Sequence, residues 1–170
     1  MAKVSFSSEQ ATGKQDEAGV ARVPSLSASN GRSCTALAPF AVLTHYELFL
    51  DPVCKLFMAR RTSARFEQLE DIRSCFSDVE KLLANVERRV HVLLVDVRRG
   101  PGRNDPGFEL AIEEHRGKLL LGFARNAALF ATPAGRLHIQ RYAKTDGRQV
   151  FVSDDPRAVF ANLALPDHEI

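Results

Sequence analysis

The segment from Val90 to Glu109 constrains the fold of this chain more than any other part of the sequence. It begins with Val90–Val97, a run that is apolar and β-branched enough to form a buried central strand. A basic, glycine-containing loop follows, and Asp105 then precedes Pro106 in the pattern of an N-cap and a proline at the first helical position. A strand, a loop and a helix in this order are typical of α/β proteins, whose sites usually lie at the carboxyl ends of the strands.

Composition narrows the class of protein. The chain has 170 residues, 45% of them hydrophobic and 26% charged, as in one ordinary globular domain. Its net charge of +2 is too small to predict general binding to nucleic acid or to an anionic membrane. Cys34, Cys54 and Cys75 lack metal-site spacing, and their odd number, with no recognisable signal sequence, favours a reducing cytoplasm. The apolar runs are too short to predict membrane insertion.

The sequence divides into three parts. Residues 1–43 are rich in Ser, Ala and Gly without a sustained apolar period, which predicts a disordered N-terminal tail. An inert extension is favoured over a docking arm for this tail. Residues 44–165 are expected to form the α/β domain, and residues 166–170 a short C-terminal tail.

The first half of the predicted domain contains a hairpin and a helix. Two short apolar runs, 45–50 and 54–60, are joined by the turn-forming pair Asp51-Pro52. Thr62 or Ser63 is then expected to cap a helix. The apolar stripe of this helix recurs at three- and four-residue intervals and comprises Phe66, Leu69, Ile72, Phe76, Val79, Leu82, Leu83 and Val86.

The second half alternates strands and helices. After the Val90–Val97 strand, the pattern predicts a helix over 106–121, a strand over 123–132, a helix over 133–144, a strand over 149–152 and a helix ending at Leu163. The resulting order, β-β-α-β-α-β-α-β-α, predicts a mostly parallel sheet packed by helices, with the hairpin as its antiparallel edge.

This order, together with Leu93-Leu-Val-Asp96 followed by Asn104-Asp-Pro-Gly-Phe108, resembles the STAS domain in its SpoIIAA-like, or STAS/SEC14, branch. In anti-sigma-factor antagonists of that family, the equivalent junction carries Asp-Ser-Ser-Gly-Leu, whose second serine is phosphorylated by a partner kinase. When Asn104, Gly107 and Phe108 are aligned with the Asp, Gly and Leu of this motif, Asp105 and Pro106 align with its two serines. The phospho-acceptor serine is therefore missing from this chain.

The resemblance implies a non-enzymatic regulatory or protein-interaction domain of bacterial signalling, in the cytoplasm, with a protein partner and no nucleic acid. An alternative, which the SEC14 label suggests, is a domain that binds a small anionic or lipid-like ligand. A deep cavity distinguishes the two, because an interaction module should have a smooth apolar and basic surface, whereas a lipid carrier needs an enclosed apolar pocket of roughly 300 Å³ or more.

The predicted site for a partner or an anion lies at the junction between strand and helix. Its members are Asp96, Arg98, Arg99, Arg103, Asn104 and Asp105. A helix N-terminus behind a basic loop can hold an anion, but an aspartate at the N-cap already occupies those backbone donors. A capped helix with a solvated loop is therefore the favoured interpretation, followed by a partner surface and then a small-anion pocket. Asp96 is expected to bond the loop's own N–H groups.

The remaining candidates give no catalytic residue, cofactor or metal ligand. His115 and Arg116 follow two glutamates in mid-helix without the spacing of a zinc motif, so a solvent-facing charge cluster is expected. His138 is expected to have a structural or surface role. The sequence indicates neither the identity of a partner nor the oligomeric state.

Overall fold

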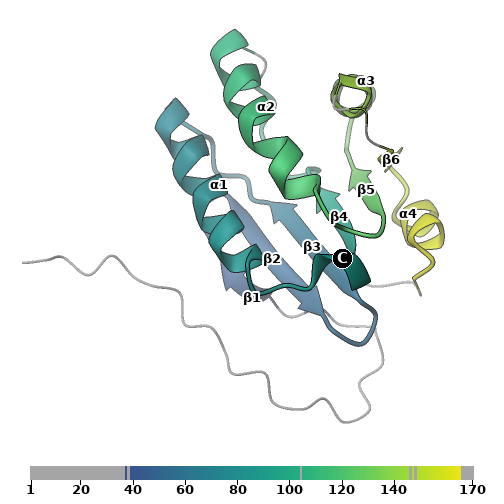
Figure 1. Cartoon of the computed structure of the whole chain (residues 1–170). Coiled ribbons are helices and arrows are strands. Elements are labelled where there is room, and N and C mark those ends of the chain that lie inside the picture. Colours follow the sequence, from purple (N-terminus) through teal and green to yellow (C-terminus); the bar gives the residue numbers. More distant parts are fainter. Residues whose placement is uncertain (1–36, 38, 104, 146, 148, 166–170) are drawn as a thin grey trace, which may run out of the picture.

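The computed structural model describes residue 37 and residues 39–165, apart from residues 104, 146 and 148. This part of the chain forms a six-stranded sheet in which neighbours in space are also neighbours in sequence (Figure 1). The β1–β2 and β2–β3 pairs are antiparallel, whereas β3, β4, β5 and β6 run parallel. The strands are β1 (Pro39–Val42), β2 (Tyr46–Asp51), β3 (Leu56–Arg61), β4 (Val92–Asp96), β5 (Asn126–Leu129) and β6 (Phe151–Ser153).

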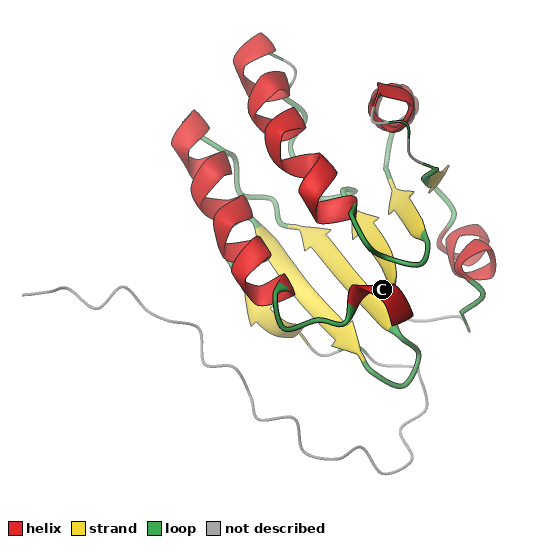
Figure 2. Ribbon diagram, viewed as in Figure 1, coloured by secondary structure: helices red, strands yellow, loops and turns green. Residues whose placement is uncertain are grey.

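Helices cover both faces of this sheet (Figure 2). They are α1 (Leu69–Leu83), α2 (Pro106–Leu120), α3 (Pro133–Thr145) and α4 (Pro156–Leu163), with a short 3-10 helix at Arg88–Val90. The side chains of α1 and α2 form one core with the sheet, and those of α4 form a second core on the opposite face. Right-handed crossovers between strands that follow one another in the sheet place α1, α2 and α3 on the same face.

Alternation along β3 explains the two cores. Leu56 and Met58 pack in the core under α4, whereas Phe57 and Ala59 pack in the core under α1 and α2. Successive side chains of a strand point to opposite faces, so a strand covered on both sides has apolar residues at every position. The next residue on the α1 side is Arg61, which is buried although it is charged.

The predicted α/β class, the antiparallel hairpin and the mostly parallel sheet are confirmed. The helix that begins at Pro106 is confirmed with Asp105 as its N-cap, and so is the helix that begins at Pro156. Strand ends differ by a few residues. The predicted strand 90–97 is Val92–Asp96, 123–132 is Asn126–Leu129, and 149–152 is Phe151–Ser153.

The boundary expected at residue 43 between tail and domain is wrong. Pro39–Val42 forms the edge strand β1, with Ala41 buried and the ring of Phe40 lying 5.9 Å from that of Phe57. The apolar contacts of this short strand come from the rest of the sheet, which explains why its own sequence shows no period. The predicted tails at 1–36 and 166–170 lie outside the described residues.

The start expected for the first long helix is also wrong, because the helix begins at Leu69. The Thr62 hydroxyl donates instead to the carbonyl oxygen of Thr44 at 2.7 Å. Asp71 supplies the cap, since its Oδ2 accepts from the N–H groups of Gln68 at 2.8 Å and Glu67 at 2.9 Å. No helix within the described residues combines the length and the apolarity that crossing a membrane requires.

Candidate functional site

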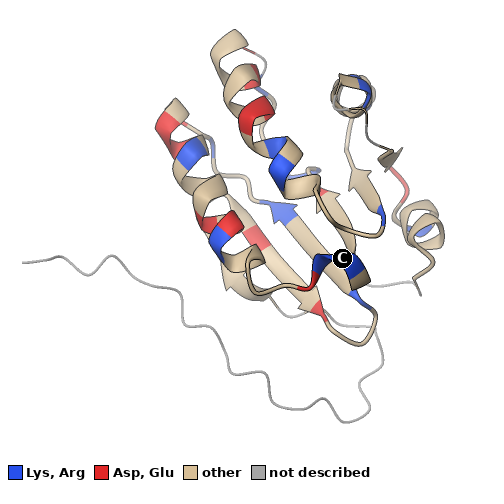
Figure 3. Cartoon of the chain, viewed as in Figure 1, with Lys and Arg blue, Asp and Glu red and all other residues tan. Residues whose placement is uncertain are grey.

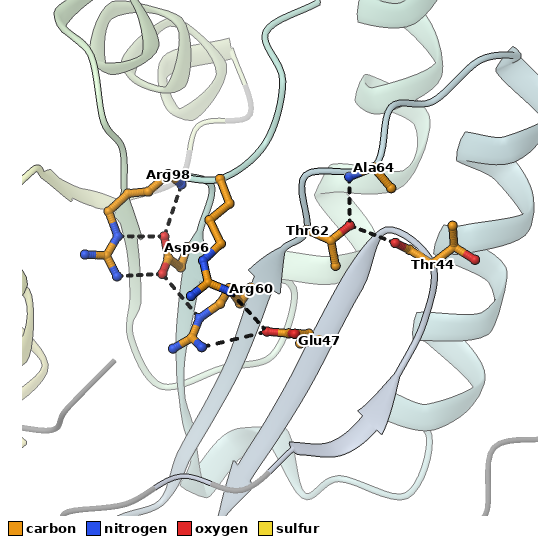
Figure 4. Close-up of polar contacts among 8 residues, drawn as sticks. Thr44, Glu47, Arg60, Thr62, Ala64, Asp96 and Arg98 are labelled. Carbon is orange, nitrogen blue, oxygen red and sulfur yellow. Dashed lines mark hydrogen bonds and ion pairs between the residues drawn. The ribbon is translucent and has the colours of Figure 1, made fainter.

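The predicted junction is organised around Asp96, the last residue of β4. Asp96 is 1% exposed, and Arg98 holds its carboxylate with two parallel bonds, Nε to Oδ1 at 3.0 Å and Nη2 to Oδ2 at 2.8 Å (Figure 4). The N–H of Arg98 also donates to Oδ1 at 3.1 Å. The expected role of Asp96, bonding the loop's own N–H, is therefore confirmed. Hydrogen bonding to Asp96 raises the pKa of Arg98 above its ordinary value.

A chain of ion pairs extends from Asp96 across the sheet (Figure 4). Arg60 lies 3.6 Å from the Asp96 carboxylate and 3.7 Å from that of Glu47 on β2. Arg99 also reaches Glu47, at 3.8 Å, from an exposed position. These arginines thus have carboxylate partners within the protein.

The second group of predicted residues lies at the start of α2. Asp105 Oδ1 accepts from the N–H of Phe108 at 3.0 Å, and Oδ2 accepts from Nε of Arg103. Arg103 also donates to the carbonyl oxygen of Phe66 at 2.7 Å, which fastens the loop to the segment before α1. The Arg103 guanidinium, and next the Phe108 N–H, hold the pKa of Asp105 below its usual range.

The six predicted residues therefore do not converge on one point. Asp96 pairs with Arg98, Arg103 pairs with Asp105, and Arg99 reaches Glu47. Asn104 lies outside the described residues. Binding of a partner or an anion by this set remains a prediction, and most of its positive charge is already neutralised by neighbouring carboxylates.

A feature that sequence reasoning missed is a cleft of about 690 Å³ between α2 and α3, over the ends of β4 and β5. α3 stands apart from α2 (Figure 1), and none of its residues is buried. Most of the cleft surface is apolar. Its apolar walls and floor include Val95, Phe108, Ile112, Leu119, Ala128, Ala134, Ile139 and Ala143.

The charged side chains that line this cleft are all basic among the described residues. They are Arg61, Arg98, Arg103 and Arg116, together with the imidazole of His138, and no described Asp or Glu lines the cleft. α3 itself carries basic residues and no acidic one (Figure 3). An apolar cleft in which the charged lining groups of the described residues are cations suits a ligand with an apolar body and a negative charge.

A polar cluster links α2 to α3 beside the cleft. Glu109 accepts hydrogen bonds from the Tyr142 hydroxyl and from Nη2 of Arg141 at 3.1 Å, and its Oε1 lies 3.2 Å from Nε2 of His138. Arg116, only 9% exposed, lies 3.8 Å from the centre of the Tyr142 ring. Burial, and then the bond to Glu109, raise the pKa of Tyr142, whereas burial lowers the pKa of His138.

The expectation that His115 and Arg116 form a solvent-facing cluster is wrong. The His115 ring stacks on Phe76 at 5.4 Å and lies 3.6 Å from Glu80, so it belongs to the contact between α1 and α2. The spacing contained a signal for Arg116, which falls four residues after Ile112 on the apolar stripe of α2. The half-buried position of His138 near Glu109 agrees with the structural or surface role expected for this residue.

Within the described residues, no group of three or more His, Cys, Asp or Glu side chains is arranged to hold a metal ion. The chain resembles in structure a protein from Shewanella loihica PV-4, described as uncharacterised, of the DUF3478 family and with a SpoIIAA-like fold. The two are 17% identical, and the match covers 72% of this chain and 97% of the other, with a TM-score of 0.46. No protein-family model and no curated protein sequence matches the chain.

Proposed function

We propose that the protein is a non-enzymatic binding domain whose cleft between α2 and α3 takes a small amphipathic ligand. The observation that supports this proposal is the mostly apolar space of about 690 Å³, which is well within the range of small-molecule sites. Alanines at positions 128, 134 and 143 leave room between the helices and the sheet. The lipid-like alternative is thus favoured over a domain with a smooth interaction surface.

The apolar area that such a ligand buries gives an approximate free energy of binding. An aliphatic chain that buries roughly 300 Å² of apolar surface gains about 7 kcal/mol. Part of this gain offsets the loss of translational and rotational freedom, so a charged group must add to it for useful affinity. The expected dissociation constants therefore lie in the micromolar range, about 1–100 µM.

A fluorescent fatty acid, such as dansyl-undecanoic acid, tests the proposal by titration against the full-length protein. Ala143→Phe fills the cleft from α3 and should weaken binding about tenfold or more, because the added ring occupies the ligand's volume. Gln140→Phe is the matched control, since it adds the same ring to an exposed position of α3 outside the cleft lining. The control should bind as the wild type does.

Two results would contradict the proposal. One is no binding by the wild type at concentrations up to about 100 µM with any chain length tried. The other is equal affinity in the Ala143→Phe and Gln140→Phe variants, which would place the probe elsewhere. Native mass spectrometry of the purified protein provides an independent measurement, because a retained small molecule would add its mass to the protein.

A second candidate is a regulatory protein-interaction role in bacterial signalling. It is favoured by Leu110 on α2 and Leu137 on α3, which are 61% and 68% exposed although both are large and apolar. If these leucines contact a partner, replacing both with Ser should abolish co-purification of one defined protein while fatty-acid binding persists. Unchanged co-purification would exclude this surface.

A further inference from the structure

The surroundings of Arg61 differ from those of Arg98, Arg99 and Arg103, the arginines in the loop between β4 and α2. It ends β3 on the face that packs under α1 and α2, is 6% exposed and lines the cleft. Its Nη1 donates to the carbonyl oxygen of His45 at 2.7 Å, and its Nη2 donates to that of Ala64 at 2.9 Å. The guanidinium also lies 4.2 Å from the centre of the Phe66 ring. These partners orient the cation, but they are all neutral.

The charge of Arg61 therefore has no carboxylate partner among the described residues, whose ion pairs do not include it. Arg98 and Arg103, which line the same cleft, are each paired with an aspartate. Buried charges in proteins are usually paired, because an uncompensated charge is expensive to remove from water. Burial lowers the pKa of Arg61, which agrees with a site where a counter-ion would be stabilising.

We infer that Arg61 is the anion-binding residue of the cleft and that the ligand is an amphipathic monocarboxylic acid. This inference rests on the proposed function and adds the chemical class of the ligand. The carboxylate of such an acid balances the charge of one guanidinium and can accept hydrogen bonds from it. The aliphatic chain then extends from Arg61 along the apolar walls between α2 and α3.

The loop after β4 holds Arg61 in position. A Cβ atom built on Gly100 would lie 2.6 Å from Cγ of Arg61, so the glycine backbone rests directly on the aliphatic part of the arginine. Gly100 also donates its N–H to the carbonyl oxygen of Val97 at 3.1 Å, which fixes the turn. Gly100→Ala should therefore displace the Arg61 side chain without removing its charge.

Calorimetric titration with decanoate and with 1-decanol at pH 8 tests the inference, because the two ligands share a chain length and differ in charge. The wild type should bind the acid about tenfold or more tightly than the alcohol. Arg61→Met should reduce the affinity for the acid to that for the alcohol, with the alcohol unchanged. Gly100→Ala should lose part of the preference. Arg99→Met is the control, because Arg99 does not line the cleft, and it should keep the preference.

The outcomes separate the two proposals. If the wild type binds neither ligand, the proposed function fails. If it binds acid and alcohol equally, a ligand cleft remains, but the assignment of Arg61 and of a carboxylate is overturned. An unchanged preference in Arg61→Met also overturns it. If Arg61→Met fails to fold, the inference is tested by the relative affinities of the wild type for acid and alcohol and by the Gly100→Ala variant. Neither measurement requires removal of the arginine.

Discussion

At the scale of single residues, Arg98 and Arg99 carry the same charge in one loop but are expected to contribute differently to the stability of the fold. Arg98 makes two parallel bonds to the buried carboxylate of Asp96, whereas Arg99 reaches Glu47 from an exposed position at 3.8 Å. Exposed ion pairs contribute little to stability, because water solvates both charges well. A buried carboxylate that loses its partner is left with an uncompensated desolvation cost.

Arg98→Ala should therefore lower the free energy of unfolding by about 2–3 kcal/mol. Arg60 lies 3.6 Å from Asp96 and limits the loss. Arg99→Ala should change the same free energy by less than about 0.5 kcal/mol. Urea denaturation of both variants measures the difference, and equal stabilities would mean that Asp96 is solvated in the folded protein.

At the scale of elements, β1 is held by its neighbours. Its three register pairs with β2 include an irregularity between Pro39 and Ala41, and Val42 is largely exposed. Ala41 and Phe40 nevertheless contribute to the core under α1 and α2. The strand is thus a small but real part of the folded domain.

Two truncations separate the contribution of β1 from that of the preceding segment. A chain that begins at residue 37 retains the strand, whereas one that begins at residue 43 lacks it. The shorter chain should be less stable by about 2–4 kcal/mol, because Phe40 and Ala41 no longer cover the core. Thermal melts compare the two, and identical midpoints would show that β1 contributes no stability.

Local signals explain which elements the sequence predicts correctly. Asp105-Pro106 and Asp155-Pro156 mark helix starts because an aspartate side chain caps the backbone and proline has helical φ within the same few residues. The Val92–Asp96 strand is predictable because it is apolar at nearly every position.

Features that depend on distant contacts are not predictable in this way. The contact between Arg116 and the ring of Tyr142 joins two different helices. The paired state of Arg98 follows from the depth of Asp96 in the sheet, although both residues were predicted members of the site. The cleft depends on the separation of α2 and α3, for which a sequence contains no local signal.

At the scale of the whole molecule, two weak acids are buried in the core that joins α1 to the sheet. Burial raises the pKa of Tyr46 on β2 and that of Cys75 on α1 to about 12 each, from ordinary values of 10.0 and 9.0. Each group therefore remains protonated in the folded chain at pH values where it ionises in the unfolded chain. Above the unfolded-state pKa, ionisation favours the unfolded state.

The free energy of unfolding should consequently fall as the pH rises from about 9 towards 12. Both contributions are fully present below pH 9 and are lost progressively above it. Tyr46→Phe should make the decline shallower above pH 10, since the phenylalanine ring fills the site and does not ionise. Urea denaturation at a series of pH values measures both slopes. A Tyr46→Phe slope equal to that of the wild type would contradict the prediction.

The order of the strands in the sheet also bears on how the chain assembles. Each strand from β2 to β6 pairs with the strand that precedes it in sequence. The two antiparallel pairs close over short turns, whereas each parallel pair closes over a whole helix, as when Leu56 pairs with Val92. The antiparallel strands are therefore expected to pair earlier in folding than the parallel ones. During synthesis on the ribosome, the partner of each new strand from β2 to β6 has already been synthesised, so the sheet can grow in the direction of translation.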